Sequence, residues 1–181
     1  MPPRRWRALQ GAATIAVRVP EPAVPGKPLA IRVEVTNVSA GHAIPTSITE
    51  LRQVWIDLRV TGEDGSVLYR SGAVDGKGRV DPEAVMYHSV LADRNGRVTY
   101  RPWEAEKMVF EKLIPPKGTV TESYAIPLPA GVKGPLRVTA TLRYRSAPQD
   151  VLDEMFGAGR FSIETVEMAE DSSQVGVFAA P

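Results

Sequence analysis

The chain contains two histidines, and one of them, His42, lies in a short loop after an alternating apolar segment. The loop reads VTNVSAGHAIPTS over residues 35–47, with Gly41 directly before the histidine and Pro45 three residues after it. A neutral imidazole is a good ligand for haem iron. Because proline restricts the backbone, this loop is expected to hold the ring in one orientation with little entropy left to lose on binding.

The alternative for His42 is structural, with the imidazole closing the turn by a hydrogen bond to backbone as Thr46 and Thr49 would. His88 is a weaker candidate ligand, because it stands alone between Tyr87 and Ser89 and the default for such a residue is a surface histidine. The sequence contains no HxH, HxxH or HExxH spacing, so it does not predict a zinc or copper site built from this chain alone.

The sequence has no cysteine. Disulfides, thiolate metal sites, a cysteine nucleophile and covalent attachment of c-type haem through Cys-x-x-Cys-His are therefore excluded. No G-x-S-x-G elbow or phosphate-binding glycine loop is present, and adjacent acids such as Glu63 and Asp64 are expected to be solvated turn charges. Asp75, Asp81 and Asp93 lack the spacing of a calcium loop. We therefore expect the protein not to be an enzyme.

The composition favours a single all-β domain spanning residues 1–181. Sixteen prolines and fifteen glycines are spread along 181 residues that are 43% hydrophobic, as in chains of short strands joined by turns. The formal net charge is only +1, so no overall field favours binding of nucleic acid. No apolar run approaches the roughly 20 residues that a membrane-spanning helix needs.

Apolar and polar residues alternate in several segments, which predicts half-buried antiparallel strands. The clearest examples are Leu29–Val35 and Leu136–Tyr144. In residues 51–60, Trp55 falls on the side that faces outward or toward a neighbour. We predict one hairpin over residues 51–70 and a second formed by 119–127 with 136–144. Outside residues 72–118, the predicted strands are 12–19, 29–35, 51–60, 66–70, 119–127, 136–144 and 161–168.

Residues 72–118 form a long, irregular insertion with one or two short strands expected, and residues 103–109 are predicted to form a short helix after Pro102. A second short helix is predicted over 147–156, where apolar residues form one stripe. The core spans 9–168 and a tail spans 169–181, docked through Val177 and Phe178. A signal peptide is not evident: Gln10 and Gly11 interrupt the apolar run after a basic start, so a first strand over 12–19 is favoured.

Seven or so strands with hairpin connections predict an immunoglobulin-like antiparallel β-sandwich. The succession of LQGAATIAV, LAIRVEVTNVSAGHAIPTSITELRQVWIDLRV, DGSVLYRSGAV, IPPKG and LRVTATLRYRSAPQ resembles the C-terminal immunoglobulin-like domain of multihaem c-type cytochromes. The resemblance covers residues 9–168 and is sharpest in the AGHxxPTG loop. This chain departs from the family pattern in having no CxxCH motif and in having Ser47 where the family motif has glycine.

The resemblance implies a non-enzymatic accessory subunit of an exported electron-transfer assembly, outside the cytoplasm. It implies that His42 is an axial ligand to a haem c held by a multihaem cytochrome partner, with the partner contact made by the loop residues Gly41, Ala43, Ile44, Pro45 and Thr46. The alternative is an extracytoplasmic adhesion or carbohydrate-binding sandwich without a redox role. In that case an aromatic platform of Trp55, Tyr100 and Trp103 would stack on sugar.

Overall fold

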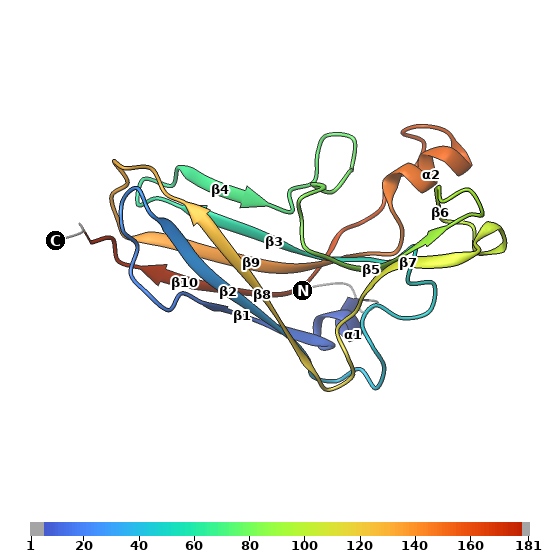
Figure 1. The fold of residues 1–181 in the computed structure, drawn as a ribbon, viewed down its shortest axis with the longest axis horizontal. Helices are drawn as coiled ribbons and strands as arrows, with labels where there is room; N and C mark the ends of the chain where they lie inside the picture. The colour runs from blue at the N-terminus through green and yellow to red at the C-terminus, as the bar shows by residue number, and fades with distance from the viewer. Residues whose placement is uncertain (1–5, 179–181) are drawn as a thin grey trace.

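The computed structural model describes residues 6–178, and two antiparallel sheets dominate it (Figure 1). The elements in chain order are α1 (Arg7–Gln10), β1 (Ala13–Arg18), β2 (Pro28–Asn37), β3 (Gln53–Thr61), β4 (Val67–Ser71), β5 (Met86–Ala92), β6 (Val98–Thr99), the 3-10 turn η2 (Pro102–Glu104), β7 (Lys107–Lys112), β8 (Thr119–Pro127), β9 (Leu136–Arg145), α2 (Gln149–Phe156) and β10 (Val166–Val175). The basic start of the chain (1–5) and the end of the predicted tail (179–181) lie outside the described residues.

The smaller sheet has the order β1-β2-β8, and the larger has the order β10-β9-β3-β5-β6, with β4 added to β3 and β7 added to β5. Alternate residues of β1, β2, β3 and β9 point into the space between the sheets, where Val33 and Val35 of β2 and Leu58 and Leu142 of the larger sheet are buried in one core. The predicted all-β, immunoglobulin-like sandwich is confirmed.

One predicted hairpin is confirmed and the other is wrong. β3 pairs with β4, so residues 51–70 form the expected hairpin. β8 and β9 do not pair: β8 joins β2 in the smaller sheet, while β9 lies between β3 and β10 in the larger. Alternation predicts that each strand has one buried face, but it does not say which strand is its neighbour.

The insertion contains three strands rather than one or two, and its later part forms an arm beside α2, at the end of the molecule away from the β3–β4 connection (Figure 1). The predicted helix over 103–109 is wrong. Only η2 is helical there, and residues from Lys107 onward form β7, which pairs with β5. The β-forming run Met108-Val109-Phe110 finds backbone partners in β5, and this tertiary pairing overrides the helical start at Pro102.

The C-terminal elements differ from the prediction mainly at their boundaries. The predicted helix is present as α2, whereas the last strand begins at Val166 and continues to Val175, into residues predicted as tail. Beyond it Val177 bridges Ala23, so this segment docks as expected. Alternation does not predict α1, a single helical turn. No helix within residues 6–178 is long and apolar enough to cross a bilayer.

Trp55 and Arg145 lie on the outer side of the larger sheet, yet both are fully buried. The insertion covers them: the Trp55 indole N–H donates to the carbonyl of Gly72 at 2.9 Å, and Arg145 donates to the carbonyl of Gly78. Arg145 also donates to Gln53 Oε1 at 2.9 Å, and its guanidinium lies 5.2 Å from the centre of the Trp55 ring. This outer face therefore forms a second, smaller packed layer.

The insertion can approach the sheet this closely because of Gly72. Its φ is +90°, a conformation that favours glycine, and a Cβ atom there would lie 2.3 Å from the carbonyl oxygen of Ile56. The backbone of the insertion thus rests directly on β3, where it can accept the indole and guanidinium hydrogen bonds.

We predict that Arg145→Ala lowers the free energy of unfolding by about 3 kcal/mol, because it removes a buried charged donor from two acceptors and its packing on Trp55. Arg137→Ala, on the same strand but exposed, should change stability by less than about 0.5 kcal/mol. Urea unfolding measured by tryptophan fluorescence checks both values. Equal effects of the two variants would contradict the role assigned to Arg145.

Candidate functional site

The loop that carries His42 is held at its start by Asn37, the last residue of β2. This side chain is fully buried. Its Nδ2 donates to the carbonyl of His42 at 2.8 Å, and its Oδ1 accepts from the backbone N–H of Ala40 at 3.1 Å. Both polar atoms of one rigid amide are therefore used to fix the backbone around the histidine.

A backbone bridge fixes the other side of the loop. Ile44 N–H donates to the carbonyl of Ile114 at 2.9 Å, and Ile114 N–H donates back to Ile44 at 2.8 Å. The Ile44 side chain belongs to the core, and the following Pro45 is also buried, after a cis peptide bond. Gly41, by contrast, is exposed, and a Cβ atom there would meet nothing within 4 Å. The loop is therefore fixed by Asn37 and Ile114 rather than by Gly41.

The His42 side chain is exposed, and its Nδ1 lies 2.9 Å from the carbonyl oxygen of Ala43. A carbonyl oxygen only accepts, so Nδ1 carries the proton in this hydrogen bond. The lone pair of the neutral ring then resides on Nε2. Metal-binding histidines commonly have this arrangement, in which one ring nitrogen donates to a backbone carbonyl and the other binds the metal. The structural hydrogen bond and a ligand role for His42 are thus compatible.

His42 borders a pocket of about 410 Å³ between the loop, α1 and strands β9 and β10. Its apolar lining includes Leu9, Tyr144 and Met168, and its rim carries the Arg52 guanidinium, which donates to the carbonyl of Ser146 at 2.7 Å. Among the described residues that line this pocket there is no carboxylate. The arrangement is suited to a flat apolar group that carries negative charge at its edge.

The predicted contact residues differ in accessibility. Gly41 and Thr46 are exposed, Ala43 is half-buried, and Ile44 and Pro45 are buried. Sequence reasoning missed Asn37, Ile114 and Arg52. An asparagine at the end of an alternating strand, just before a glycine-containing loop, was the available signal for Asn37. No local pattern connects Ile114 or Arg52 to this loop.

Ser47 adopts φ = +70°, in the left-handed region that favours glycine. The expected family motif has glycine at this position. Glycine would adopt this conformation without a Cβ penalty, whereas the serine bears the strain.

His88 does not join this site. It lies half-buried on β5, with its ring centre 5.6 Å from that of Phe110, and burial lowers its pKa. His88 is not part of the pocket beside His42. Within residues 6–178 no three histidine, cysteine, aspartate or glutamate side chains are grouped so that they could hold a metal ion. A metal bound by His42 would therefore need ligands from outside the described residues.

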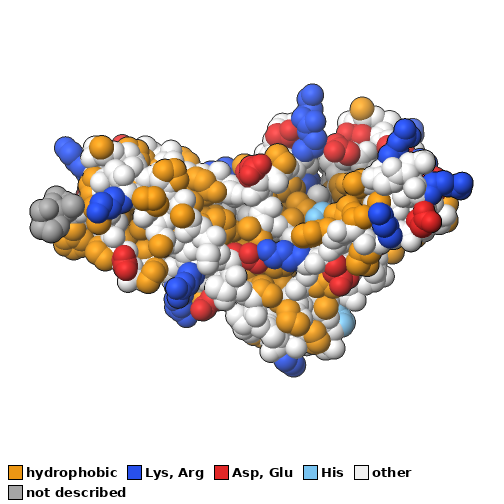
Figure 2. Space-filling view, in the orientation of Figure 1, with side chains coloured by type: hydrophobic (Ala, Val, Ile, Leu, Met, Phe, Trp, Pro, Cys, Tyr) orange, Lys and Arg blue, Asp and Glu red, His pale blue; other side chains and the backbone are white. Residues whose placement is uncertain are grey.

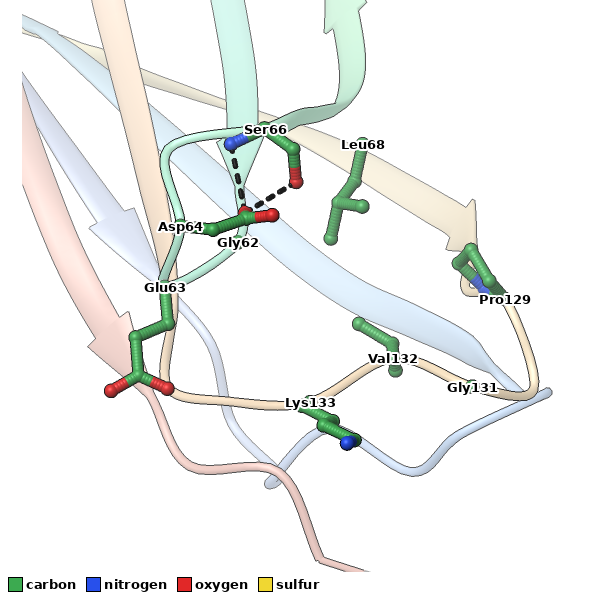
Figure 3. Close-up of a pocket in the computed structure, with 9 residues that line it drawn as sticks. All are labelled: Gly62, Glu63, Asp64, Ser66, Leu68, Pro129, Gly131, Val132 and Lys133. Carbon is green, nitrogen blue, oxygen red and sulfur yellow. Dashed lines mark hydrogen bonds between the residues drawn. The ribbon is translucent and has the colours of Figure 1, made fainter.

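Other hollows have different chemistry. One of about 660 Å³ lies between the β3–β4 and β8–β9 connections (Figure 3). There the carboxylate of Asp64 accepts from both the backbone and the hydroxyl of Ser66. Another brings Tyr100 and Trp103 together, but Trp55 is buried elsewhere, so the platform of three aromatic residues does not form.

No protein-family model and no curated protein matches the chain. Among solved structures the chain is similar to a penta-heme cytochrome c552 from Thermochromatium tepidum, with a TM-score of 0.67 and 22% identity over 92% of this chain and 40% of that one. A CARDB domain from Pyrococcus furiosus gives a TM-score of 0.37 and 14% identity over 92% of this chain and 94% of that domain, which is too distant for inference. The likeness to the cytochrome establishes the fold, and this chain spans about 40% of that chain's length.

We predict that Ser47→Gly raises the free energy of unfolding by up to about 1 kcal/mol, because glycine adopts a positive φ without the Cβ penalty. Ser47→Val should lower it by about 1–2 kcal/mol, because a branched side chain disfavours this conformation. Thermal unfolding of the two variants checks the predicted order. A less stable Ser47→Gly would contradict it.

Proposed function

We propose that the protein is a non-enzymatic accessory module of a multihaem c-type cytochrome assembly. In this proposal it packs on the haem protein and donates His42 Nε2 as an axial ligand to a haem held by that partner. The carrying observation is the fixed, exposed imidazole, whose Nδ1 is held by the Ala43 carbonyl at 2.9 Å. A ligand held in one orientation loses little entropy on binding.

The surroundings of His42 fit a haem edge. The pocket walls are apolar, and Arg52 supplies a positive charge at the rim, where a haem propionate could accept from it. A haem with two histidine ligands carries one electron at a time. The role of this chain would be to orient the imidazole and to exclude water from its side of the ring. Because the chain contains no cysteine, the covalently bound haem would be carried by the partner.

Two further observations support the proposal. The structural likeness includes a protein described as a penta-heme cytochrome, and Ser47 has a positive φ that suits glycine, the residue of the resembled motif at this position. Together they favour a haem partner and a location outside the cytoplasm, where proteins with covalently bound haem c work. The electron donor and acceptor would belong to the partner.

The test uses a haem c peptide that has one axial histidine and one open axial position. We predict that the protein converts its spectrum to that of a low-spin, six-coordinate haem, and that His42→Ala abolishes the change. His88→Ala is the matched control, because it removes the only other histidine, and it should bind as the wild type does. Loss of the low-spin band in His88→Ala but not in His42→Ala would refute the assignment.

The same titration tests whether the loop must be preorganised. We predict that Asn37→Ala weakens binding of the haem peptide by about tenfold while His42 remains present, because the His42 carbonyl loses its buried partner. Thr36→Ala removes an exposed hydrogen bond from the residue before Asn37, which does not line the pocket beside His42, and should leave binding unchanged. Unaltered binding in Asn37→Ala would show that the loop does not depend on this amide.

A further inference from the structure

Glu50 is a buried acid with no partner in the described part of the chain. It is only 8% exposed, yet no hydrogen bond or ion pair to its carboxylate occurs within residues 6–178. Within the described residues the fully enclosed side-chain polar atoms that lack a partner are Tyr124 Oη and Arg145 Nε, so the Glu50 oxygens keep contact with solvent. The side chain lines a pocket of about 680 Å³, which gives its carboxylate an open approach.

Three segments remote in sequence build this pocket. Residues 48–51 contribute Glu50, residues 97–104 form the wall from the arm, and α2 supplies Val151, Glu154 and Met155. The Glu50 segment is anchored to β5, because Thr49 Oγ1 lies 2.7 Å from Ser89 Oγ and the Ser89 N–H donates to the Thr49 carbonyl. An ion pair of 2.6 Å between Arg101 and Glu154 ties the arm to α2. The backbone that carries Glu50 is therefore fixed in place by β5.

The charges of the pocket favour a cation. The lining contains four carboxylates and two guanidinium groups, so its formal charge is −2. Arg101 already pairs with both Glu104 and Glu154. Arg97 lies beside Asp93, whose pKa is lowered mainly by the hydrogen bond from the Arg97 backbone, with a smaller contribution from the Arg97 charge. Glu50 is the acid left without a cation.

The rim is apolar and aromatic. Trp103 is 80% exposed and Met155 is 67% exposed, and Tyr100 lines the same pocket. Hydrophobic and charged side chains are interspersed over the end of the molecule formed by the arm and α2 (Figure 2). Indole and phenol rings attract cations through their faces, and tryptophan and tyrosine are frequent anchors of protein interfaces.

We infer that this pocket binds a lysine or arginine side chain of a partner protein, with Glu50 as its counter-ion and Trp103 and Tyr100 as its aromatic walls. The surface of a partner protein would also cover the exposed side chains of Trp103 and Met155 at the rim of the pocket. A free polyamine would leave both side chains exposed. A neutral sugar would stack on Trp103 but would leave the Glu50 charge uncompensated. The inference does not depend on haem binding by His42, which lines a different pocket.

The test uses two blocked tripeptides, acetyl-Leu-Arg-Leu-amide and its analogue with citrulline, which has the shape of arginine without its charge. Binding is followed through the indole N–H signal of Trp103 in nitrogen-15 NMR spectra. We expect the arginine peptide to bind about tenfold more tightly than the citrulline peptide. Glu50→Gln should remove this difference, and Trp103→Ala, followed through neighbouring amide signals, should weaken binding of both peptides.

The stability of the free protein gives an independent readout. Glu50→Gln should not lower the midpoint of thermal unfolding, because no hydrogen bond or ion pair within the described residues uses its charge and the variant keeps the shape of the side chain. Glu63→Gln, in an exposed turn at the other end of the sandwich, is the matched control and should leave it unchanged.

Three outcomes would overturn the inference. Equal binding of the arginine and citrulline peptides would exclude a cation site, and a lower melting temperature for Glu50→Gln would show that Glu50 has a structural role. A shift of the Trp103 signal with a neutral oligosaccharide but not with the arginine peptide would identify a glycan site instead. None of these results bears on His42, so the haem proposal and this inference can fail separately.

Discussion

The buried amide of Asn37 is the interaction on which the geometry of the His42 loop depends. Its two hydrogen bonds hold the backbone at Ala40 and His42, while the bridge between Ile44 and Ile114 closes the loop against the core. Burial makes an unsatisfied amide costly, so the loop cannot move without breaking these bonds. The imidazole thereby gains a fixed orientation from a side chain that would not itself touch a ligand.

The insertion between β4 and β8 serves two purposes. Its first part rests on the larger sheet and buries Trp55 and Arg145, so a face that would otherwise be solvated becomes packed. Its later part leaves the sheet as an arm and exposes Trp103. Proteins commonly present binding residues on an exposed segment that a packed segment holds in place. The conformational entropy of the packed segment is already lost on folding, so less is lost when a partner binds.

His42 and Glu50 both lie in the connection between β2 and β3, and each is a candidate binding residue for a different physical reason. The Nδ1 atom of His42 donates to the Ala43 carbonyl, which leaves Nε2 with its lone pair exposed. The imidazole can therefore be both held by the loop and accessible to a ligand. Glu50 lacks a partner within the described residues, and its side chain lines an open pocket. The resemblance to a cytochrome-associated domain pointed to the first residue, whereas only burial and charge distinguish the second.

The sequence by itself determined most strands of the sandwich and the side of each that faces the core, because alternation follows directly from the pleat of a strand. It also isolated His42, since the chain has few histidines and a distinctive loop around this one. Only the tertiary structure decided that β8 pairs with β2 in the other sheet rather than with β9, that Trp55 is covered, and that Glu50 and Trp103 line one pocket. These outcomes depend on contacts between residues remote in the chain, which no local pattern records.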